Sequence, residues 1–429
     1  MLRSITLGNF KSFPLSTAPL GPLTLIVGTN ASGKSNLREA LRLFHGVGLG
    51  YSLADILGDK YGPGGVLQWR GIRGGAIEAS YRGLGELFLQ MEFEVLESSG
   101  LTPRRFIYRL DVDLEDRALG PRVSEEFLKR NWESHIFDSN PIDDPLEQMH
   151  SHQLRVRFPR GGNNKKHGQT LAFSSARPVV SQLAEHRDST PEVRAICQAV
   201  LDTFASMRFL DLDPDAMRQP SQPGQLILGD RGENLSSVLQ GICQNPEKKS
   251  TLVEWLRALT PMDATDFVFK TDFTGKVLVY LKESSGFEVS AYSASDGTLR
   301  FLAMIAALLS EDSGRIYFFE EFDNGIHPTR LHLLLDLVQR ASQSMNVQVI
   351  GTTHNPALLA FLDERAREDA LLVYRSDKAG GSRVVRIMEL PGAKEVLESQ
   401  DLGRLHQSGW LEDAAIFSEP DEAEGENGD

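Results

Sequence analysis

The chain has 429 residues, more than one average domain contains, which predicts two or three units or one large domain with insertions. Its formal net charge is −14, but residues 412–429 alone carry eight acidic and no basic residues. The rest of the chain has 51 acidic and 45 basic residues, a net charge of −6. This balance excludes a generally basic nucleic-acid binder, although it allows a local basic surface.

The two cysteines, Cys197 and Cys243, lie far apart without a metal-ligand spacing, so neither a disulfide framework nor a structural zinc site is predicted. The first residues lack the basic head and long apolar stretch of a signal peptide. The longest apolar segment, residues 301–309, is half of what a membrane-spanning helix requires. We therefore expect a cytoplasmic protein with no membrane partner.

Apolar runs predict strands at residues 2–7 and 23–27, and a helix is predicted after Lys34. Residues 46–75 are rich in glycine and are expected to form irregular connections. Residues 76–95 alternate polar with apolar or aromatic side chains, which is the period of half-buried antiparallel strands. The N-terminal part is therefore expected to contain an antiparallel β lobe beside its first helix.

Residues 98–170 differ from their surroundings, because they are dense in charge, proline and asparagine. This texture predicts an insertion with a flexible loop. Four basic side chains gather near its end, at Arg155, Arg157, Lys165 and Lys166. Two interpretations of them stay open: a contact with DNA phosphates, or a charge run that is merely solvated.

The second half of the chain begins with spacing that predicts helices at 191–208, 234–242 and 250–259 and strands at 267–270 and 276–282. Helices and strands then alternate, with helices from Thr298, Thr329 and Pro356 and strands at 315–319, 347–351 and 371–374. Such alternation predicts a parallel, helix-covered sheet. The acidic tail at 412–429 is expected to be disordered.

The sharpest motif is a glycine-rich turn between the strand at 23–27 and the helix after Lys34. It matches the P-loop pattern at Gly28, Thr29, Asn30, Ala31, Ser32, Gly33, Lys34 and Ser35. Glycines let backbone N–H groups curl around phosphate oxygens, and the helix N-terminus adds its positive end. Lys34 is expected to neutralise the β- and γ-phosphates, and the Ser35 hydroxyl to bind Mg²⁺.

Polar side chains also follow two apolar strands of the second half. Glu320 and Glu321 end the strand at 315–319, and His354 follows the strand at 347–351. Because the carboxyl ends of parallel strands meet at one sheet edge, Glu320 is predicted to reach the Mg²⁺ shell and Glu321 to polarise the attacking water. His354 is predicted to contact the γ-phosphate or that water.

A turn of small residues, 293–298, opens the helix that starts at Thr298. Its geometry fits an anion site and equally an ordinary N-cap. A separate acidic run, Asp211, Asp213 and Asp215, lies in a proline-containing loop. We interpret this run as a solvated turn rather than a metal-binding pair, so the chain is not expected to cut nucleic acid itself.

The order of these motifs resembles the ATPase heads of the ABC class, especially the SMC/RecF/OLD-like branch of AAA family ATPases. The stretch Asn9-Phe10-Lys11-Ser12-Phe13 strengthens the resemblance, which covers residues 1 to about 45 and 175 to 375. The resemblance implies an α/β P-loop NTPase fold, an ABC-type head with ATP and Mg²⁺ as its cofactors. A long coiled coil and a Toprim nuclease domain, which occur in parts of this branch, are not found in the sequence.

The resemblance also assigns roles to individual residues. Phe10, Lys11 and Asn36 are expected in the ATP site, Ser295, Asp296, Gly297 and Thr298 in the signature turn that contacts the partner head's ATP, Asp323 and Asn324 in the D-loop, and Gln182 in the Q-loop, beside Mg²⁺ and the water. Gln68 is a weaker rival for the Q-loop. Two residues depart from the family pattern, because Glu320 stands where Asp is usual and Asp296 where glycine is usual.

The predicted organisation is an N-terminal part of the head (1–97), an insertion (98–170), a C-terminal part of the head (171–411) and the tail (412–429). The predicted function is Mg²⁺-dependent ATP hydrolysis by a head-to-head homodimer, coupled to DNA sensing or clamping in DNA repair or anti-phage defence. The alternative is an ATPase scaffold that regulates a separate nuclease or toxin effector without binding DNA. A small-molecule kinase fits poorly, because it leaves the 293–298 turn and His354 unused.

Overall fold

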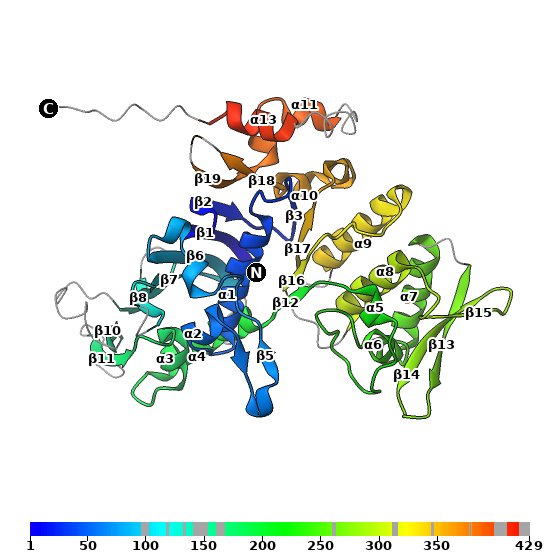
Figure 1. Ribbon diagram of the computed structural model, residues 1–429, viewed down its shortest axis with the longest axis horizontal. Helices are drawn as coiled ribbons and strands as arrows, with labels where there is room; N and C mark the ends of the chain where they lie inside the picture. The colour runs from blue at the N-terminus through cyan, green and yellow to red at the C-terminus, as the bar shows by residue number, and fades with distance from the viewer. Residues whose placement is uncertain are drawn as a thin grey trace.

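A central parallel sheet stands between two lobes in the computed structural model (Figure 1). The structure describes residues 1–95, 103–116, 120–131, 134–139, 153–159, 168–259, 263–310, 316–344, 347–376, 378, 380–398 and 410–419. One lobe is formed mainly by the first 205 residues, and the other by residues that lie between 214 and 309.

The central sheet has six strands in the order β12-β16-β17-β3-β18-β19. Their bounds are β12 Met207–Leu210, β16 Ile316–Phe319, β17 Gln348–Thr353, β3 Leu23–Val27, β18 Leu371–Ser376 and β19 Gly381–Arg386. The first five are parallel, and β19 pairs antiparallel with β18. The parallel, helix-covered sheet predicted from the alternating pattern is thus present.

The parallel strands are largely apolar, and β16 is apolar at every position, because each face of the sheet packs on a different hydrophobic core. In β16, Tyr317 and Phe319 belong to the core shared with the C-terminal lobe, whereas Ile316 and Phe318 belong to the core of the N-terminal lobe. Ile26 of β3 likewise faces the N-terminal core, and its neighbours in the strand face the other one. Burial on both faces explains why the sequence shows continuous apolar runs here instead of alternation.

The N-terminal lobe is built on an eight-stranded antiparallel sheet in the order β11-β10-β9-β8-β7-β6-β1-β2. Its strands are β1 Leu2–Phe10, β2 Phe13–Pro19, β6 Glu86–Val95, β7 Arg104–Asp113, β8 Arg122–Arg130, β9 Ser134–Asp138, β10 Gln153–Phe158 and β11 Gln169–Ser174. Helices α1 Lys34–Gly48, α3 Val179–Glu185 and α4 Pro191–Ala205 contribute to the same core.

This sheet includes the described strands of the segment 98–170, which was predicted to be an insertion. Strand β7 pairs with β6 along its whole length, from Glu86 opposite Asp113 to Val95 opposite Arg104. Strands β8, β9 and β10 then continue the same sheet. The segment is therefore an extension of the N-terminal β lobe, and charge alternating with apolar residues marks strands with one solvated face.

The C-terminal lobe contains a three-stranded antiparallel sheet, β13-β14-β15, packed on helices. Its elements are α5 Pro214–Met217, α6 Leu235–Ile242, α7 Pro246–Leu259, β13 Ala264–Thr271, β14 Val277–Glu283, β15 Glu288–Ser290 and α8 Asp296–Leu309. From Leu299 to Leu309 only Arg300 of α8 is not buried. A helix this apolar on all sides forms the centre of its lobe.

The remaining elements revise the prediction for residues 46–75. The glycine-rich region 46–75 contains the end of α1, α2 Leu53–Leu57, β4 Lys60–Tyr61, η1 Pro63–Gly65 and β5 Leu67–Trp69, so it is not only irregular connection. It is followed by the 3-10 helices η2 Ala76–Glu78 and η3 Tyr81–Gly83. After β16 come η5 Pro328–Arg330, α9 Leu331–Ser344, η6 Pro356–Phe361, α10 Glu364–Glu368, η7 Ile387–Glu389, α11 Ala393–Glu398 and α13 Trp410–Phe417.

Helix α13 contradicts the expected disorder of the acidic tail for residues 412–417. Leu411 and Ala415 on this helix are buried against the core, next to β18 and β19 (Figure 1). Just beyond it, the Glu419 carboxylate accepts hydrogen bonds from the hydroxyls of Tyr374, at 3.0 Å, and Ser376, at 2.8 Å. The rest of the predicted tail, 420–429, lies outside the described residues.

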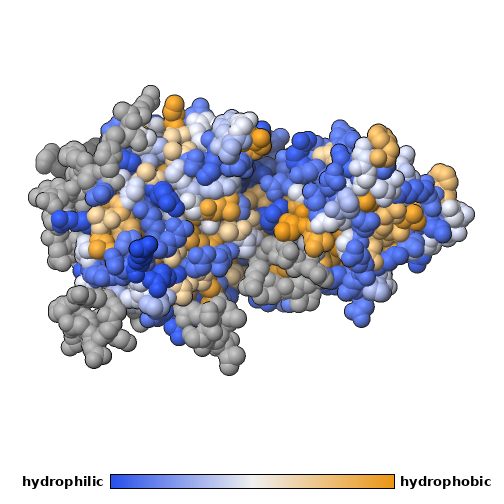
Figure 2. All heavy atoms as spheres, turned by 90° about the horizontal axis from the view of Figure 1, so that it is seen from below, coloured by the Kyte–Doolittle hydropathy of each residue, from blue (hydrophilic) through white to orange (hydrophobic). Residues whose placement is uncertain are grey.

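Hydrophilic residues cover most of the face seen in Figure 2, interrupted by hydrophobic patches on both lobes. No helix among the described residues combines the length and the apolar character needed to cross a bilayer.

Candidate functional site

The P-loop connects β3 to α1 with a backbone that only small residues permit. A side chain at Gly28 would place its Cβ 2.2 Å from the carbonyl oxygen of Val373, and Gly33 has a φ of +121°. Gly33 is also the N-cap of α1, and no side chain caps that helix end. The first N–H groups of α1 therefore remain available to an anion.

This loop forms one wall of a cavity of about 730 Å³, a volume that suits a nucleotide. The cavity is lined by Lys11, Ser12, Asn30, Ala31, Ser32, Gly33, Lys34, Ser35, Asn36, Arg73, Glu78, Glu320, Glu321, Thr352, His354 and Arg375. The predicted P-loop, the two glutamates and the histidine thus meet at one site. Lys34 and His354, 320 residues apart in sequence, come within 3.3 Å of each other.

Lys34 is held by the backbone of its own loop. Its Nζ donates to the carbonyl oxygens of Gly28, at 2.6 Å, and Thr29, at 2.8 Å, and the residue is buried. Burial lowers the pKa of Lys34 from 10.5 to about 8, because the ammonium loses water, while the carboxylates of Glu321, Glu412 and Glu320 act in the opposite direction. A phosphate in the cavity would add a negative charge beside the Lys34 ammonium and so stabilise its charged form.

The two glutamates that follow β16 have different surroundings. The Glu320 carboxylate forms an ion pair with Arg38, 3.4 Å away, which lies one helical turn beyond Lys34 on α1. Glu321 has a positive φ of 45°, unusual for a residue with a Cβ, and its N–H donates to the Thr352 hydroxyl at 3.1 Å. Such strain is typical of functional positions, and it turns the Glu321 side chain toward the cavity.

Neighbouring parallel strands bring His354 to the same edge. Phe319 of β16 pairs with Gly351 of β17, and Thr353 of β17 pairs with Val27 of β3. His354 Nδ1 lies 3.1 Å from the carbonyl oxygen of Gly28, and its Nε2 lies 3.8 Å from Glu321 Oε1. The ring therefore stands between the P-loop and the carboxylate predicted to act on water.

The predicted D-loop residues form hydrogen bonds with side chains at this edge of the sheet. Asp323 accepts a hydrogen bond from the Thr353 hydroxyl at 2.7 Å, and burial raises the pKa of Asp323. Asn324 donates from Nδ2 to Glu321 Oε2 at 3.0 Å. A movement of this loop would therefore be transmitted directly to Glu321.

The predicted signature turn, residues 295–298, lies outside the cavity, at the N-terminus of α8 in the C-terminal lobe. Ser295 is the N-cap, and its hydroxyl accepts from the Thr298 N–H at 3.2 Å, so the ordinary capping role left open by the sequence is fulfilled. A Cβ on Gly297 would lie 2.1 Å from the carbonyl oxygen of Gly325, which requires glycine at this position. The Asp296 carboxylate turns to Arg218 at 2.6 Å.

Two predicted site residues are not in the cavity. Gln182 lies on α3 and uses its side-chain amide to bind the backbone of Ser174 and Arg177, so its Q-loop assignment is wrong. Phe10 is fully buried in the N-terminal core and does not line the cavity. Its neighbour Lys11 does line it and forms an ion pair with Glu39 at 3.5 Å.

Strand β12, which periodicity did not identify, ends beside the two glutamates. Strand β12 is the parallel neighbour of β16, and the Glu320 N–H donates to the carbonyl oxygen of Leu210 at 3.2 Å. Asp211 therefore occupies the strand end beside the glutamates. Arg38, Arg73, Glu78, Thr352 and Arg375 were also missed as members of the site; only Arg38, four residues after Lys34 on the same helix, carried a local signal.

The predicted DNA contacts are only partly within the described chain. Arg155 and Arg157 lie on β10 and point away from the core, because the alternate residues Leu154, Val156 and Phe158 are buried. Lys165 and Lys166 lie outside the described residues.

The cavity fits the phosphates of a nucleotide. The buried Ser32 hydroxyl has no hydrogen-bond partner among the described residues, and the N-terminus of α1 is uncapped. For Mg²⁺, the Ser35 hydroxyl and Glu320 offer oxygen ligands, and no cluster of three or more His, Cys, Asp or Glu side chains forms a separate metal cage in the described chain. Phosphate oxygens and water usually complete such a Mg²⁺ shell.

Comparisons with known proteins agree with this site. Residues 23–360 match the family described as "AAA domain, putative AbiEii toxin, Type IV TA system". The chain is 32% identical to an "ATP/GTP phosphatase" of Helicobacter pylori (strain ATCC 700392 / 26695) over 383 residues, 86% of this chain and 89% of that protein.

Solved SMC heads resemble the chain at low identity. One is an SMC head bound to the C-winged helix domain of ScpA, at 15% identity and a TM-score of 0.49, covering 90% of this chain and 97% of the other. Another is the SMC head domain from Thermotoga maritima, at 14% identity and a TM-score of 0.40, covering 90% of this chain and 98% of the other.

Proposed function

Because the chain belongs to the AAA-domain family that includes putative AbiEii toxins, and is an ATP hydrolase with a P-loop NTPase head, we propose a dimeric mechanism. Two copies of the chain close head to head around two Mg·ATP molecules. In this dimer the cavity of each head binds one ATP, and the signature turn of the other head covers its γ-phosphate. The observation that carries the proposal is the position of the signature turn, outside the cavity of its own chain.

Each residue of the cavity has a separate role in the proposed hydrolysis. The N–H groups at the start of α1 and the ammonium of Lys34 hold the β- and γ-phosphates in a site that excludes water from one side. Ser35 and Glu320 hold Mg²⁺, which supplies charge stabilisation to the phosphate oxygens, and Arg38 restrains the Glu320 carboxylate. Glu321 accepts the proton of the attacking water, and His354 orients that water against the γ-phosphate.

Glu321 and the D-loop give the dimer a way to control this reaction. Asn324 binds Glu321 directly, and Asp323 is anchored to Thr353 of β17. Contact between the D-loop and a partner head would reposition Glu321 and couple hydrolysis to closure.

We further propose that closure is coupled to DNA sensing or clamping, in DNA repair or anti-phage defence. Arg155 and Arg157, one β-strand period apart on the solvated face of β10, support a phosphate-binding surface. The second candidate is a scaffold that regulates a separate effector without contacting DNA. The family description, which names a putative toxin of a type IV toxin–antitoxin system, favours this candidate.

Size-exclusion chromatography with light scattering on Glu321→Gln tests the dimer. We expect a monomer without nucleotide and a stable dimer with Mg·ATP, because the variant binds ATP but hydrolyses it slowly. Lys34→Ala, which lacks the phosphate-binding ammonium, is the matched control and should stay monomeric. A Glu321→Gln chain that binds ATP and remains a monomer would refute the head-to-head dimer.

The same column separates the two couplings when double-stranded DNA is added to the Glu321→Gln dimer. Co-elution that is weakened by salt, and weakened further by Arg155→Ala with Arg157→Ala, supports the DNA coupling. Absence of any DNA complex at low salt contradicts it and leaves the effector scaffold, for which a second polypeptide should co-purify and be released on hydrolysis.

A further inference from the structure

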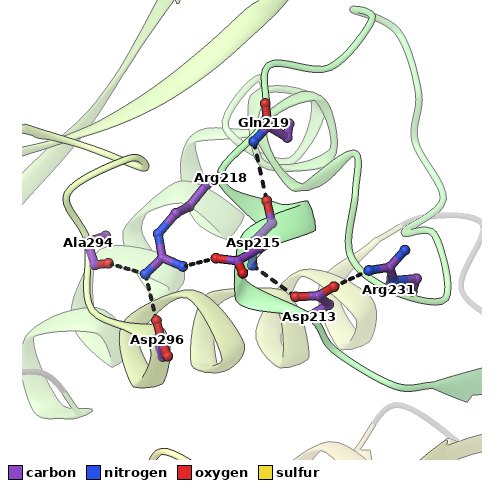
Figure 3. A network of polar contacts seen from close by, with 7 residues as sticks. All are labelled: Asp213, Asp215, Arg218, Gln219, Arg231, Ala294 and Asp296. Atoms are coloured by element: carbon purple, nitrogen blue, oxygen red, sulfur yellow. Dashed lines mark hydrogen bonds and ion pairs between the residues drawn. The ribbon is translucent and has the colours of Figure 1, made fainter.

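Arg218 joins the signature turn to the loop that follows β12 (Figure 3). Its Nη2 donates to Asp296 Oδ1 at 2.6 Å and to the carbonyl oxygen of Ala294 at 3.1 Å, and its Nη1 donates to Asp215 Oδ1 at 3.0 Å. The guanidinium thus lies directly at the N-terminus of α8. It binds one backbone oxygen and two carboxylates.

The exposure of these three side chains is unequal. The Arg218 side chain is only 20% exposed, whereas those of Asp296 and Asp215 are 63% and 93% exposed. Exposed ion pairs contribute little to stability, so both carboxylates can leave at small cost. The bond to the Ala294 carbonyl would still hold the guanidinium against the turn after they leave.

The position of Asp296 makes a nearby cation necessary in the proposed dimer. A carboxylate at the start of α8 would repel a γ-phosphate that approached the turn, unless a cation neutralised it or drew it aside. Arg218 does both in the described structure. Its planar fork also matches two phosphate oxygens as well as it matches two carboxylates.

We propose that Arg218 binds the γ-phosphate of the ATP held by the partner head, and that Asp296 is its substitute ligand while the heads are apart. This inference rests on the dimer proposed above. It assigns to Arg218 a role in the hydrolysis of the partner's ATP, and to Asp296 a role in positioning Arg218.

Arg218 is also connected to the cavity of its own head through the short segment that follows β12. Arg218 follows Leu210, the last residue of β12, by eight residues, and the carbonyl oxygen of Leu210 binds the Glu320 N–H. Between them Asp213 forms an ion pair with Arg231 and accepts the N–H of Asp215 at 3.0 Å (Figure 3). In each head, a short segment therefore connects the sheet edge at Glu320 to Arg218, the residue proposed to bind the other head's ATP.

A mixing experiment tests whether Arg218 acts across the dimer. Arg218→Ala chains lack the proposed phosphate contact but keep Glu321, and Glu321→Gln chains lack the water-activating carboxylate but keep Arg218. Each variant alone should hydrolyse ATP about 100-fold more slowly than the parent, the usual cost of losing one donor to a transition-state charge. Mixed at equal concentration before ATP is added, the two should recover about one quarter of the parent rate, because half of the dimers are mixed and each has one complete site.

Recovery on mixing supports a role for Arg218 across the dimer, because a residue that acted only within its own head would not be complemented by a partner. If Glu321→Gln dimerises with ATP but the mixture stays inactive, Arg218 does not act across the dimer and the inference fails alone. If Glu321→Gln does not dimerise at all, the proposed function fails instead. Nucleotide binding to Arg218→Ala should equal that of the parent, since Arg218 does not line its own cavity.

Arg231→Ala is the matched control. Arg231 lies in the same network but binds only on the far side of Asp213, and it should leave hydrolysis within about twofold of the parent. An equal loss in Arg231→Ala and Arg218→Ala would assign the effect to the loop as a whole.

Discussion

The phosphate cavity and the signature turn each place a loop at a helix N-terminus, but they are stabilised by different contacts. In the cavity, Lys34 and His354 bind carbonyl oxygens of the P-loop and are fixed by strands that pack on two cores. At the signature turn, Arg218 is held largely by the exposed carboxylates of Asp215 and Asp296. The cavity is thus complete once the chain has folded, whereas the turn retains ligands that can be exchanged.

In the proposed dimer, a second molecule would act at the turn and not inside the cavity. Backbone contacts inside a packed structure cannot be replaced without unfolding, so the cavity is organised for a ligand that always binds the same way. Exposed ion pairs exchange partners at a cost of about 1 kcal/mol or less. Substitutions that change one region and leave the other intact test this difference between fixed contacts in the cavity and exchangeable ion pairs at the turn.

The largest effect is expected for Lys34→Ala. Removing the buried ammonium takes away a charged hydrogen bond to the phosphates, and ATP affinity should fall by at least about 100-fold. Titration with a fluorescent ATP analogue measures this loss. Lys270→Ala removes an exposed lysine that pairs with Glu288 in the other lobe, and it should bind ATP like the parent. Affinity retained in Lys34→Ala would show that the cavity does not hold the phosphates.

A smaller effect is expected from pH. Because burial lowers the pKa of Lys34 to about 8, the free site loses its ammonium as the pH rises through 8, while bound phosphates favour the charged form. ATP affinity should therefore be constant below pH 8 and fall about tenfold by pH 9. In Glu321→Gln, which lacks the carboxylate that raises this pKa most, the fall should begin at lower pH. An affinity that does not change up to pH 9.5 would contradict the lowered pKa.

The smallest effect is expected for Asp296→Asn, made in the Glu321→Gln chain. Loss of one exposed carboxylate near the approaching γ-phosphate should lower the ATP concentration for half-maximal dimer formation by about two- to fivefold. Light scattering over a series of ATP concentrations measures the midpoint. Asp336→Asn removes an equivalent exposed pair with Arg340 on α9 and should leave the midpoint unchanged. A higher midpoint in Asp296→Asn would show that this carboxylate assists closure.

Sequence reasoning predicted the parts of the site whose chemistry is local. The P-loop, Glu320, Glu321 and His354 each follow an apolar strand directly, so the strand order of a parallel sheet was enough to bring them together. Gln182 was assigned by type and approximate position alone, and its amide binds the nearby backbone of Ser174 and Arg177. A single polar residue on a short helix carries no pattern that shows where its side chain points.

Errors in the fold arose where composition was used in place of pairing. Charge-rich residues after 98 belong to strands with one solvated face, and β7 pairs with β6. The alternation of polar and apolar residues identifies such strands, whereas the overall composition does not. The acidic end of the chain was expected to be disordered from its net charge, yet Leu411 and Ala415 supply an apolar face and Glu419 finds the hydroxyls of Tyr374 and Ser376. Two buried residues were enough to dock α13.

The position of β3 in the central sheet has a consequence for synthesis of the protein. This strand is made among the first residues, but its two neighbours, β17 and β18, are made more than 300 residues later. At translation rates of about 5–20 residues per second, the P-loop strand waits roughly 20–70 seconds for a partner. A nascent chain is therefore unable to bind ATP until nearly all of it has left the ribosome, and premature truncation should give chains that aggregate instead of partly active heads.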